Sequence, residues 1–287
     1  MSEEINELKR KLRDASKEIV DTETNNKEEI EVYKKSIEES KELIRQISSK
    51  QKINHILTRI SEDARERLLG STQFQELFKN TSKCDAVVVS IDIRRSTELM
   101  LKARTPELFS KFITQLSYLL SQVIISNFGI FDKFTGDGIL SFFPTFYSGK
   151  DAIIRAIKAS QECHKVFREH YYNSKDCFNV FIKDIGLGIG IDFGNVTLVN
   201  TENELTVVGI PVVYACRFSG ADAGETILNH PAKEEILRLC PSLVTISETD
   251  ILIKNEGTAI AYKVSLNDAA YNLEDPDWDS LEEEFKK

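Results

Sequence analysis

Two aspartates stand out in the sequence because each lies where a carboxylate is costly without a positive partner. Asp92 ends the largely apolar run at 87–91, and Asp137 lies between two glycines in a predicted hairpin turn. An unpaired buried carboxylate is strongly disfavoured. Two such residues on neighbouring strands could hold a pair of divalent cations, and paired cations clamp the attacking and leaving oxygens of a phosphoryl displacement.

The elements expected around the two aspartates alternate between strands and helices. We expect a buried strand at 86–91, a helix beginning near Pro106, and a hairpin of 129–134 against 139–143. The other expected elements are a helix at 149–171, a strand at 185–191, a segment at 205–208, a helix at 211–222 and β-rich residues at 243–266. This order predicts an α+β sandwich with helices on one face of the sheet.

The N-terminal segment differs in composition from the rest of the chain. Residues 1–62 contain neither proline nor glycine, and their apolar residues recur at spacings of three and four, as in a coiled coil. Polar residues 22–26 interrupt this pattern, so a solvated single helix or a partly disordered arm is the alternative. We favour a long self-pairing helix, because so thin an apolar stripe gains little alone.

The chain therefore divides into three predicted parts. They are a helical coiled-coil segment at 1–70, a mixed domain at 84–266 and an acidic C-terminal tail at 267–287. The tail is a docked or loose appendage, and the residues that could anchor it are Trp278, Leu281 and Phe285.

Composition argues against several classes of function. A net charge of −9 over 287 residues disfavours nucleic-acid binding, which needs clustered Lys and Arg. No run of about 18 apolar residues occurs, so we expect no membrane span, and the acidic start argues against a secretory signal. The five cysteines lack CxxC spacing, which favours reduced thiols in a cytoplasmic protein. Zinc held by Cys163, His164 and Cys177 would lack a fourth ligand.

Four segments in order carry a resemblance to a known family. They read Asp-Ile-Arg-Arg-Ser-Thr at 92–97, Lys-Phe-Thr-Gly-Asp at 133–137, Gly-Ile-Asp-Phe-Gly at 190–194 and Gly-Ile-Pro-Val-Val-Tyr-Ala-Cys-Arg at 209–217. Each segment is a weak signal alone, but four in order at suitable spacing are strong. Residues 84–266 therefore resemble the catalytic domain of class III nucleotidyl cyclases, which implies a ferredoxin-like class III cyclase sandwich.

The resemblance implies a head-to-tail homodimer whose active sites are shared between the subunits. Asp92 and Asp137, with the carbonyl of Ile93, would bind two Mg²⁺ or Mn²⁺ ions per site, which would activate the ribose 3′-hydroxyl and hold the triphosphate. Lys133, Thr206 and Arg217 would reach in from the partner, with Arg217 on the charge that develops at phosphorus. Backbone amides at a helix start would cradle the phosphates, and they belong to Arg94, Arg95, Ser96 and Thr97.

Each of these residues also has a structural explanation. Asp137-Gly138 is a common turn dipeptide, and Asp92 could cap the following helix. Lys133 and Arg217 could be solvated surface charges, and Thr206 a strand threonine without a further role. The catalytic hypothesis therefore depends on their joint occurrence at the family's positions.

The residues at the base-selecting positions leave the base open. Guanylate cyclases usually have Glu where this chain has Lys133, so guanine is not expected. Lys only donates hydrogen bonds, whereas the hydroxyl of Thr206 can donate or accept, a pair that suits adenine and uracil alike. Val213 replaces the family's ribose-orienting Asn, and Arg95-Ser96 replaces its Gly-Phe. Losing a positioning hydrogen bond could cost about 1–3 kcal/mol.

Whole-segment similarity narrows the resemblance further. Segments 92–97, 134–140 and 212–217 look like those of the pyrimidine cyclases of Pycsar anti-phage systems, which make cyclic UMP or cyclic CMP for a separately encoded effector. We therefore expect a uridylate cyclase that converts UTP to cyclic UMP, ahead of cyclic CMP. The alternatives are an adenylate cyclase that makes cyclic AMP and a degenerate cyclase domain that binds nucleotide without turnover.

Overall fold

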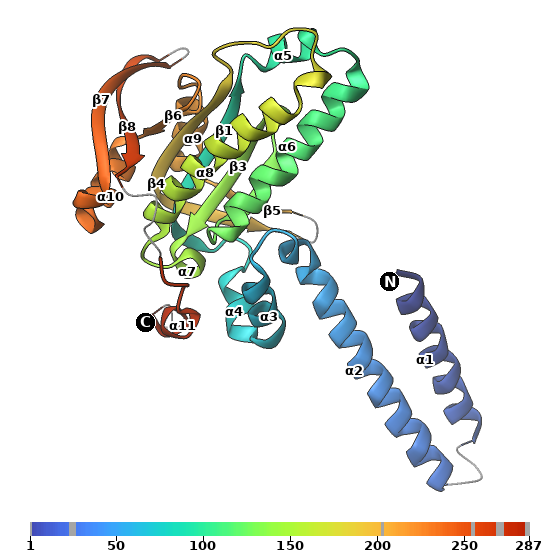
Figure 1. The fold of residues 1–287 in the computed structure, drawn as a ribbon. Coiled ribbons are helices and arrows are strands. Elements are labelled where there is room, and N and C mark those ends of the chain that lie inside the picture. The colour runs from blue at the N-terminus through green and yellow to red at the C-terminus, as the bar shows by residue number, and fades with distance from the viewer. Residues whose placement is uncertain (1, 23–26, 202–203, 254–255, 268–272, 285–287) are drawn as a thin grey trace. The chain divides into compact units, whose positions relative to one another are not determined.

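The computed structural model describes residues 2–22, 27–201, 204–253, 256–267 and 273–284. By internal contacts the chain divides into two units, residues 1–58 and 59–287 (Figure 1). The first unit consists of helices α1 (Ser2–Thr22) and α2 (Lys27–Leu57), which contact each other. The prediction was one long helix, but α1 ends where the polar interruption begins, and residues 23–26 lie outside the described ones. Self-pairing between two copies of the chain stays a prediction.

The second unit begins with two short helices, α3 (Glu62–Gly70) and α4 (Thr72–Leu77). The hydroxyl of Ser71 caps α4 by accepting a hydrogen bond of 3.0 Å from the backbone N–H of Phe74. The Phe74 side chain is fully buried and lies 5.6 Å from the ring of Phe78. The short helix predicted around Phe74 is thus present, and its aromatic residues anchor it to this unit.

A sheet of eight strands forms the centre of the second unit. After α4 the chain forms β1 (Lys83–Arg94), α5 (Ser96–Lys102), α6 (Pro106–Ser126), β2 (Ile130–Phe134), β3 (Gly138–Pro144), α7 (Thr145–Ser148), α8 (Ala152–Asn173) and β4 (Gly186–Asn200). It continues through β5 (Leu205–Val208), α9 (Ile210–Phe218), β6 (Glu225–Leu228), α10 (His230–Leu239), β7 (Val244–Ile253), β8 (Gly257–Leu266) and α11 (Trp278–Glu284). The order is β2-β3-β1-β4-β6-β8-β7, and β5 pairs with β4.

The first four strands have the ferredoxin-like arrangement predicted from the sequence. They follow the order β1-α6-β2-β3-α8-β4, and neighbouring strands among them run antiparallel. The parallel strand β6 and the antiparallel hairpin β7–β8 extend this sheet beyond β4. The α+β class is therefore confirmed.

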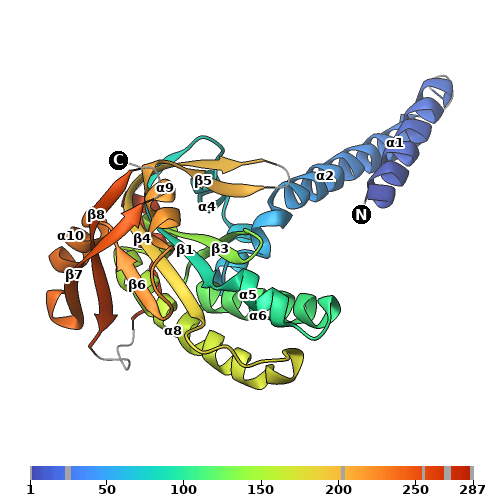
Figure 2. The ribbon, with the colours of Figure 1, turned by 90° about the horizontal axis from the view of Figure 1, so that it is seen from above.

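Helices cover both faces of the sheet, which corrects the predicted single layer of helices. Alternate residues of a strand point to opposite faces. Val89 and Ile91 of β1 join the apolar cluster that includes α6 and α8, whereas the Ser90 hydroxyl lies 3.3 Å from that of Ser219, just after α9. Figure 2 shows α6 and α8 on one side of the central strands and α9 on the other. This second layer could not be predicted from the apolar residues of β4, because α9 approaches that strand at Gly190, which has no side chain.

Helix α6 supplies much of the core on its face of the sheet. Phe112, Leu116, Leu120 and Ile124 recur at helical spacing and are buried in the main apolar cluster. By length and composition alone, α6 is also the one helix among the described residues that could cross a membrane. A core helix passes the same test, so this observation is weak support for a span.

The C-terminal tail docks on the second unit over its described residues. The indole N–H of Trp278 donates a 2.9 Å hydrogen bond to the carbonyl of Tyr147 in α7, and its ring stacks on the Tyr147 ring. Leu281 is buried, and Asp279 pairs with Arg67 of α3 at 2.5 Å. Phe285, the third predicted anchor, lies outside the described residues.

Candidate active site

Asp92 and Asp137 are neighbours at one end of the central strands. Asp92 pairs with Gly138 in the β1–β3 register, and Asp137 immediately precedes that glycine in the β2–β3 turn. The backbone N–H of Ile93 also donates a 3.2 Å hydrogen bond to the carbonyl of Asp137. The fold therefore brings together the two carboxylates that the sequence singled out.

Gly138 is required for this close approach of the two strands. A Cβ atom on it would overlap the carbonyl oxygen of Ile91 and lie 2.9 Å from the hydroxyl of Thr135. The Asp-Gly dipeptide thus has a structural role, as its turn chemistry suggests. That role places the Asp137 carboxylate beside Asp92, so the structural and the catalytic explanations are compatible.

The two carboxylates have electrostatic environments suited to cations. Burial and the neighbouring charge of Asp137 raise the pKa of Asp92, while Arg94 opposes the shift. Arg94 Nη1 lies 2.9 Å from Asp92 Oδ2, and the Ser96 hydroxyl donates a 2.5 Å hydrogen bond to Asp137 Oδ2. Positive charge placed between the carboxylates would relieve their mutual repulsion.

The residues present fit a site that a nucleotide completes. No cluster of three or more His, Cys, Asp or Glu that could hold a metal occurs among the described residues. Mg²⁺ usually keeps several waters and binds proteins through one or two carboxylates plus substrate phosphates. The half-exposed carboxylate of Asp92, with Asp137 and the Ile93 carbonyl, matches that donor set. Cys163 and His164 belong to no such cluster among the described residues.

The segment that follows β1 turns sharply into α5. Arg95 has a left-handed backbone, with φ of 61°, and precedes the first turn of the helix. Its side chain pairs with Glu98 at 2.7 Å and donates a 2.7 Å hydrogen bond to the Lys183 carbonyl. The turn leaves the backbone amides of Ser96 and Thr97 at a helix start, next to Asp137 through the Ser96 hydroxyl.

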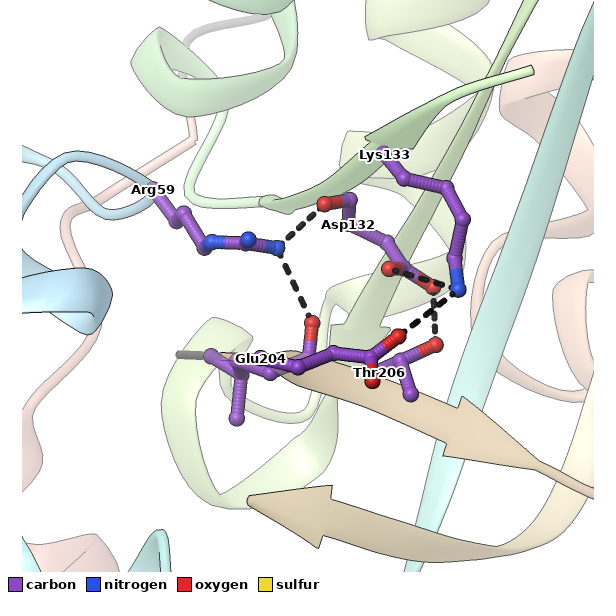
Figure 3. Close-up of polar contacts among 6 residues, drawn as sticks. Arg59, Asp132, Lys133, Glu204 and Thr206 are labelled. Atoms are coloured by element: carbon purple, nitrogen blue, oxygen red, sulfur yellow. Dashed lines mark hydrogen bonds and ion pairs between the residues drawn. The ribbon is translucent and has the colours of Figure 1, made fainter. Parts of the chain in front are cut away.

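Lys133 and Thr206, the predicted base-selecting pair, lie in one polar network (Figure 3). Lys133 Nζ lies 3.2 Å from Glu204 Oε1 and 3.7 Å from Asp132 Oδ1. The hydroxyl of Thr206 donates a hydrogen bond to Asp132 Oδ2. Strands β2 and β5, which carry the two residues, contact each other. The structure therefore brings Lys133 and Thr206 together within one chain.

Sequence reasoning missed three members of this network: Arg59, Asp132 and Glu204. The Arg59 guanidinium donates to the backbone carbonyls of Asp132 and of Leu205, the latter at 3.1 Å. Asp132 is 1% exposed, yet it stands beside Lys133 in a strand that alternates between buried and half-buried residues. This alternation is in burial and not in residue type, because Ile130 and Phe131 are both apolar while Asp132 and Lys133 are both charged. None of the three residues is therefore marked by a pattern in the sequence.

Arg217, the predicted catalytic arginine, lies on α9 and is paired with a residue other than the two aspartates. Its guanidinium pairs with Glu256 just before β8 and lies 5.5 Å from the ring centre of Tyr214. Its side chain is 34% exposed. Val213, one turn earlier on the same helix, is also exposed. Within one chain the structure does not join Arg217 to Asp92 and Asp137.

Comparison with known proteins gives matches at the level of structure alone. No protein-family model matches the sequence, and no curated protein matches it either. The adenylyl cyclase CyaB from P. aeruginosa aligns with a TM-score of 0.56 at 21% identity, over 65% of this chain and 96% of that one. The guanylyl cyclase Cya2 aligns with a TM-score of 0.57 at 21% identity, over 69% of this chain and all of that one.

The fold is that of a class III nucleotidyl cyclase domain. Within this cyclase fold, Asp92 and Asp137 come from the first strand and the first hairpin, and Lys133 lies on the same hairpin. About a third of the chain lies outside each alignment. At this level of identity the likeness establishes the fold, so the roles of individual residues rest on their own geometry.

Proposed function

We propose that this chain is a nucleotidyl cyclase that converts a nucleoside triphosphate to a 3′,5′-cyclic nucleotide and pyrophosphate. The observation that carries the proposal is the pair Asp92 and Asp137, two carboxylates from different elements held at one sheet end by the hydrogen bond from Ile93. Burial and the charge of Asp137 raise the pKa of Asp92. The turn at Gly138 explains how Asp137 comes to lie beside Asp92, but it does not require a carboxylate at either position.

The chain's own residues supply binding, orientation and charge for this reaction. Asp92, Asp137 and the Ile93 carbonyl would hold two Mg²⁺ or Mn²⁺ ions, which would lower the pKa of the ribose 3′-hydroxyl and neutralise the leaving pyrophosphate. The amides of Ser96 and Thr97 point from a helix start and suit phosphate oxygens. The 3′-oxygen forms a bond to the α-phosphorus. At the same time, the bond between the α-phosphorus and the oxygen that links it to the β-phosphate breaks, which releases pyrophosphate.

A second copy of the chain would complete the site. Arg217 is partly exposed on α9 and lies apart from the two aspartates, so a guanidinium for the developing charge would come from the partner. Exposed apolar side chains precede it along β5 and α9: Val208, Ile210 and Val213 are 59%, 71% and 46% exposed. Apolar residues grouped in this way favour an interface. We propose a homodimer with shared active sites.

We propose UTP as the substrate and cyclic UMP as a messenger in anti-phage defence that acts on a separately encoded effector. The support is the similarity of segments 92–97, 134–140 and 212–217 to pyrimidine cyclases, together with Val213, which cannot orient a ribose by hydrogen bonding. ATP is the second candidate, because a Lys–Thr pair also suits adenine. A domain that binds nucleotide without turnover is the third candidate. The presence of both Asp92 and Asp137 argues against it.

Product analysis by mass spectrometry tests the proposal. The purified full-length protein would be incubated with Mn²⁺ and an equimolar mixture of ATP, GTP, CTP and UTP. A dominant cyclic UMP signal supports the uridylate cyclase proposal, and a dominant cyclic AMP signal supports an adenylate cyclase instead. If none of the four triphosphates gives a cyclic nucleotide, the cyclase proposal is contradicted and a domain that only binds nucleotide is supported.

A further inference from the structure

Asp132 is a buried carboxylate beside the base-selecting pair that the proposed reaction leaves without a role. Its side chain is fully buried, whereas that of Lys133 is 43% exposed. Asp132 Oδ2 accepts a hydrogen bond from the Thr206 hydroxyl. Asp132 Oδ1 has no hydrogen-bond partner, and the nearest cation is Lys133 Nζ at 3.7 Å. Burying a carboxylate is unfavourable unless both of its oxygens are paired, so an oxygen without a partner calls for a functional explanation.

The Asp132 carboxylate fixes the direction of the Thr206 hydroxyl. A threonine hydroxyl has one proton to donate and two lone pairs that accept. Figure 3 shows the hydrogen bond between the Thr206 hydroxyl and the Asp132 carboxylate. An ionised carboxylate only accepts, so the proton of the Thr206 hydroxyl lies on the Asp132 side. The Thr206 oxygen then has only lone pairs left for any further partner.

Arg59 holds the two strands that carry the pair at a fixed separation. Its guanidinium donates to the carbonyl of Asp132, just before Lys133, and to the carbonyl of Leu205, just before Thr206. In return, the Arg59 carbonyl accepts a 3.2 Å hydrogen bond from the Phe131 N–H on β2. The ammonium of Lys133 and the hydroxyl of Thr206 are thereby presented together, one as a donor and the other as an acceptor.

We infer that Asp132 is a specificity-determining positioning residue, which makes Thr206 an obligate acceptor for a base N–H while Lys133 donates to the neighbouring base atom. This inference rests on the proposed function and deepens it. The edges that fit present an acceptor next to an N–H: O4 and N3 of uracil, N1 and the 6-amino group of adenine, N3 and the 4-amino group of cytosine, and O6 and N1 of guanine. Asp132 therefore selects the edge by which a base is held. An edge with two adjacent acceptors, such as N3 and O2 of cytosine, does not fit.

The charge state of Asp132 gives the inference a measurable signature. Burial raises the pKa of Asp132 to about 6, while the Thr206 hydroxyl, Lys133 and Arg59 lower it and Glu204 raises it. Above pH 6 the carboxylate is ionised and accepts the hydrogen bond that the Thr206 hydroxyl donates. Below pH 6 the protonated carboxyl can donate to Thr206 instead, which frees the Thr206 proton to face the base N–H. Thr206 then stops favouring its substrate as the pH falls through 6.

A double-mutant cycle measured against pH tests this role. The preferred substrate of the wild type, chosen between UTP and ATP by product analysis, is used with wild type, Asp132→Asn, Thr206→Val and the double variant. We expect Thr206→Val to lower kcat/KM about tenfold at pH 8, the effect of one hydrogen bond. In the Asp132→Asn background the same change should have a smaller effect, because a neutral amide can donate to Thr206 as well as accept from it and no longer fixes the direction of the hydroxyl.

The pH dependence of the wild-type to Thr206→Val ratio distinguishes positioning from mere structural support. Ionisations shared by both enzymes cancel in this ratio, so it should fall towards one between pH 7 and pH 5.5. It should not vary with pH in the Asp132→Asn background. Thr206→Ser keeps the hydroxyl and should preserve the wild-type profile. Glu204→Gln removes a charge that raises the pKa of Asp132, so it should move the midpoint of the profile to lower pH.

Two outcomes would overturn the inference, and they are distinguishable. Additive effects of Asp132→Asn and Thr206→Val, with a ratio that is the same at pH 5.5 and pH 8, assign Asp132 a structural role only. Melting temperatures of the variants that are no lower than that of the wild type show that misfolding is not the cause. A wild type that makes no cyclic nucleotide overturns the proposed function, and the inference with it.

Discussion

At the scale of single residues, two buried aspartates show how differently one sheet treats a carboxylate. Asp192 on β4 accepts hydrogen bonds from the Asn229 amide at 3.0 Å and from the Phe193 N–H at 2.8 Å, so both its oxygens are satisfied. Asp132 on β2 has one oxygen bonded to Thr206 and one without a hydrogen bond. Because native proteins rarely leave buried polar atoms unpaired, Asp132 is the functional candidate of the two.

Replacing Asp132 with Asn should stabilise the protein above pH 6. A carboxyl whose pKa is raised from 3.8 to about 6 opposes folding when it is charged, and each pKa unit corresponds to about 1.4 kcal/mol. The free energy of unfolding should therefore rise by at most about 3 kcal/mol at pH 8 and change little at pH 4, where the carboxyl is largely protonated in the folded state. Thermal unfolding at both pH values measures this.

The matched control for this prediction is Glu204→Gln, which removes an exposed carboxylate from the same network. Its effect on stability should stay within about 0.5 kcal/mol at either pH. A destabilised Asp132→Asn protein at pH 8, or an equal shift at pH 4 and pH 8, would contradict the assignment of Asp132 as a buried charge.

The sequence contained part of this residue-scale information. Asp92 was recognisable because it ends an apolar strand. Asp137 was recognisable because it is the acidic residue of the turn that follows the next predicted strand. The pairing of Lys133 with Thr206 was predicted from a family resemblance, and the structure brings the two together. The position of Asp132 next to a lysine resembled an ordinary surface ion pair, so only the strand's burial pattern reveals that one side chain is inside and the other outside.

At the scale of elements, the centre of the sheet depends on glycines that permit close backbone approach. Gly190 of β4 lies under α9, where a Cβ atom would overlap the carbonyl of Ala215 and the backbone N–H of Ser219. The contact is backbone against backbone, so no flexible side chain can move aside. The position of α9, and with it Arg217, therefore depends on a residue without a side chain.

Replacing Gly190 with Ala should destabilise the second unit by about 2–4 kcal/mol, the effect of overpacking where the backbone cannot yield. Gly70→Ala is the control, because no atom lies within 4 Å of the added methyl group. Its effect should stay within about 0.5 kcal/mol. Denaturant unfolding of both variants gives the comparison, and equal stability of the two would contradict the tight approach of α9 to β4.

Elements with a strong apolar pattern were predicted well, and their ends were predicted less well. The predicted strand at 86–91 covers only the continuously buried part of β1, because Lys83 and Asp85 at its start are exposed and lack an apolar signal. The second main helix was predicted at 149–171 and is α8, Ala152–Asn173. The helix predicted at 211–222 is α9, which ends at Phe218. Its end was hard to predict because α9 packs on glycines of β4, so its sequence lacks the regular apolar spacing that marks the length of a helix.

At the scale of the whole molecule, the residues proposed for catalysis lie in two separate groups. Asp92 and Asp137 share one end of the sheet, while Arg217 pairs with Glu256 on another part of the same unit. Exposed apolar residues on β5 and α9 lie near the second group. A sequence pattern marks these residues as apolar but does not tell core from interface, so the homodimer stays a prediction from the family resemblance.

Mixing two inactive variants tests the shared site. An Asp137→Asn chain lacks one carboxylate, an Arg217→Ala chain lacks the guanidinium, and a mixed dimer would hold one intact site. Random pairing of equal amounts makes about half of the dimers mixed, so about a quarter of wild-type activity should return. Each variant alone should remain inactive. Mixed dimers that form, as judged by tagged co-purification, yet show no recovery would contradict a site built from two chains.

The most direct test of the cyclase account is cyclic-nucleotide formation by Asp92→Asn and Asp137→Asn beside a matched aspartate variant. Asp85→Asn changes an exposed aspartate on the same strand. With Mn²⁺ and the four nucleoside triphosphates, the wild type and Asp85→Asn should form one dominant cyclic nucleotide with equimolar pyrophosphate. Asp92→Asn and Asp137→Asn should lose at least about 100-fold, since about 3 kcal/mol of charge stabilisation is removed. Wild-type-like turnover by either variant, or no cyclic product from the wild type, would contradict the account.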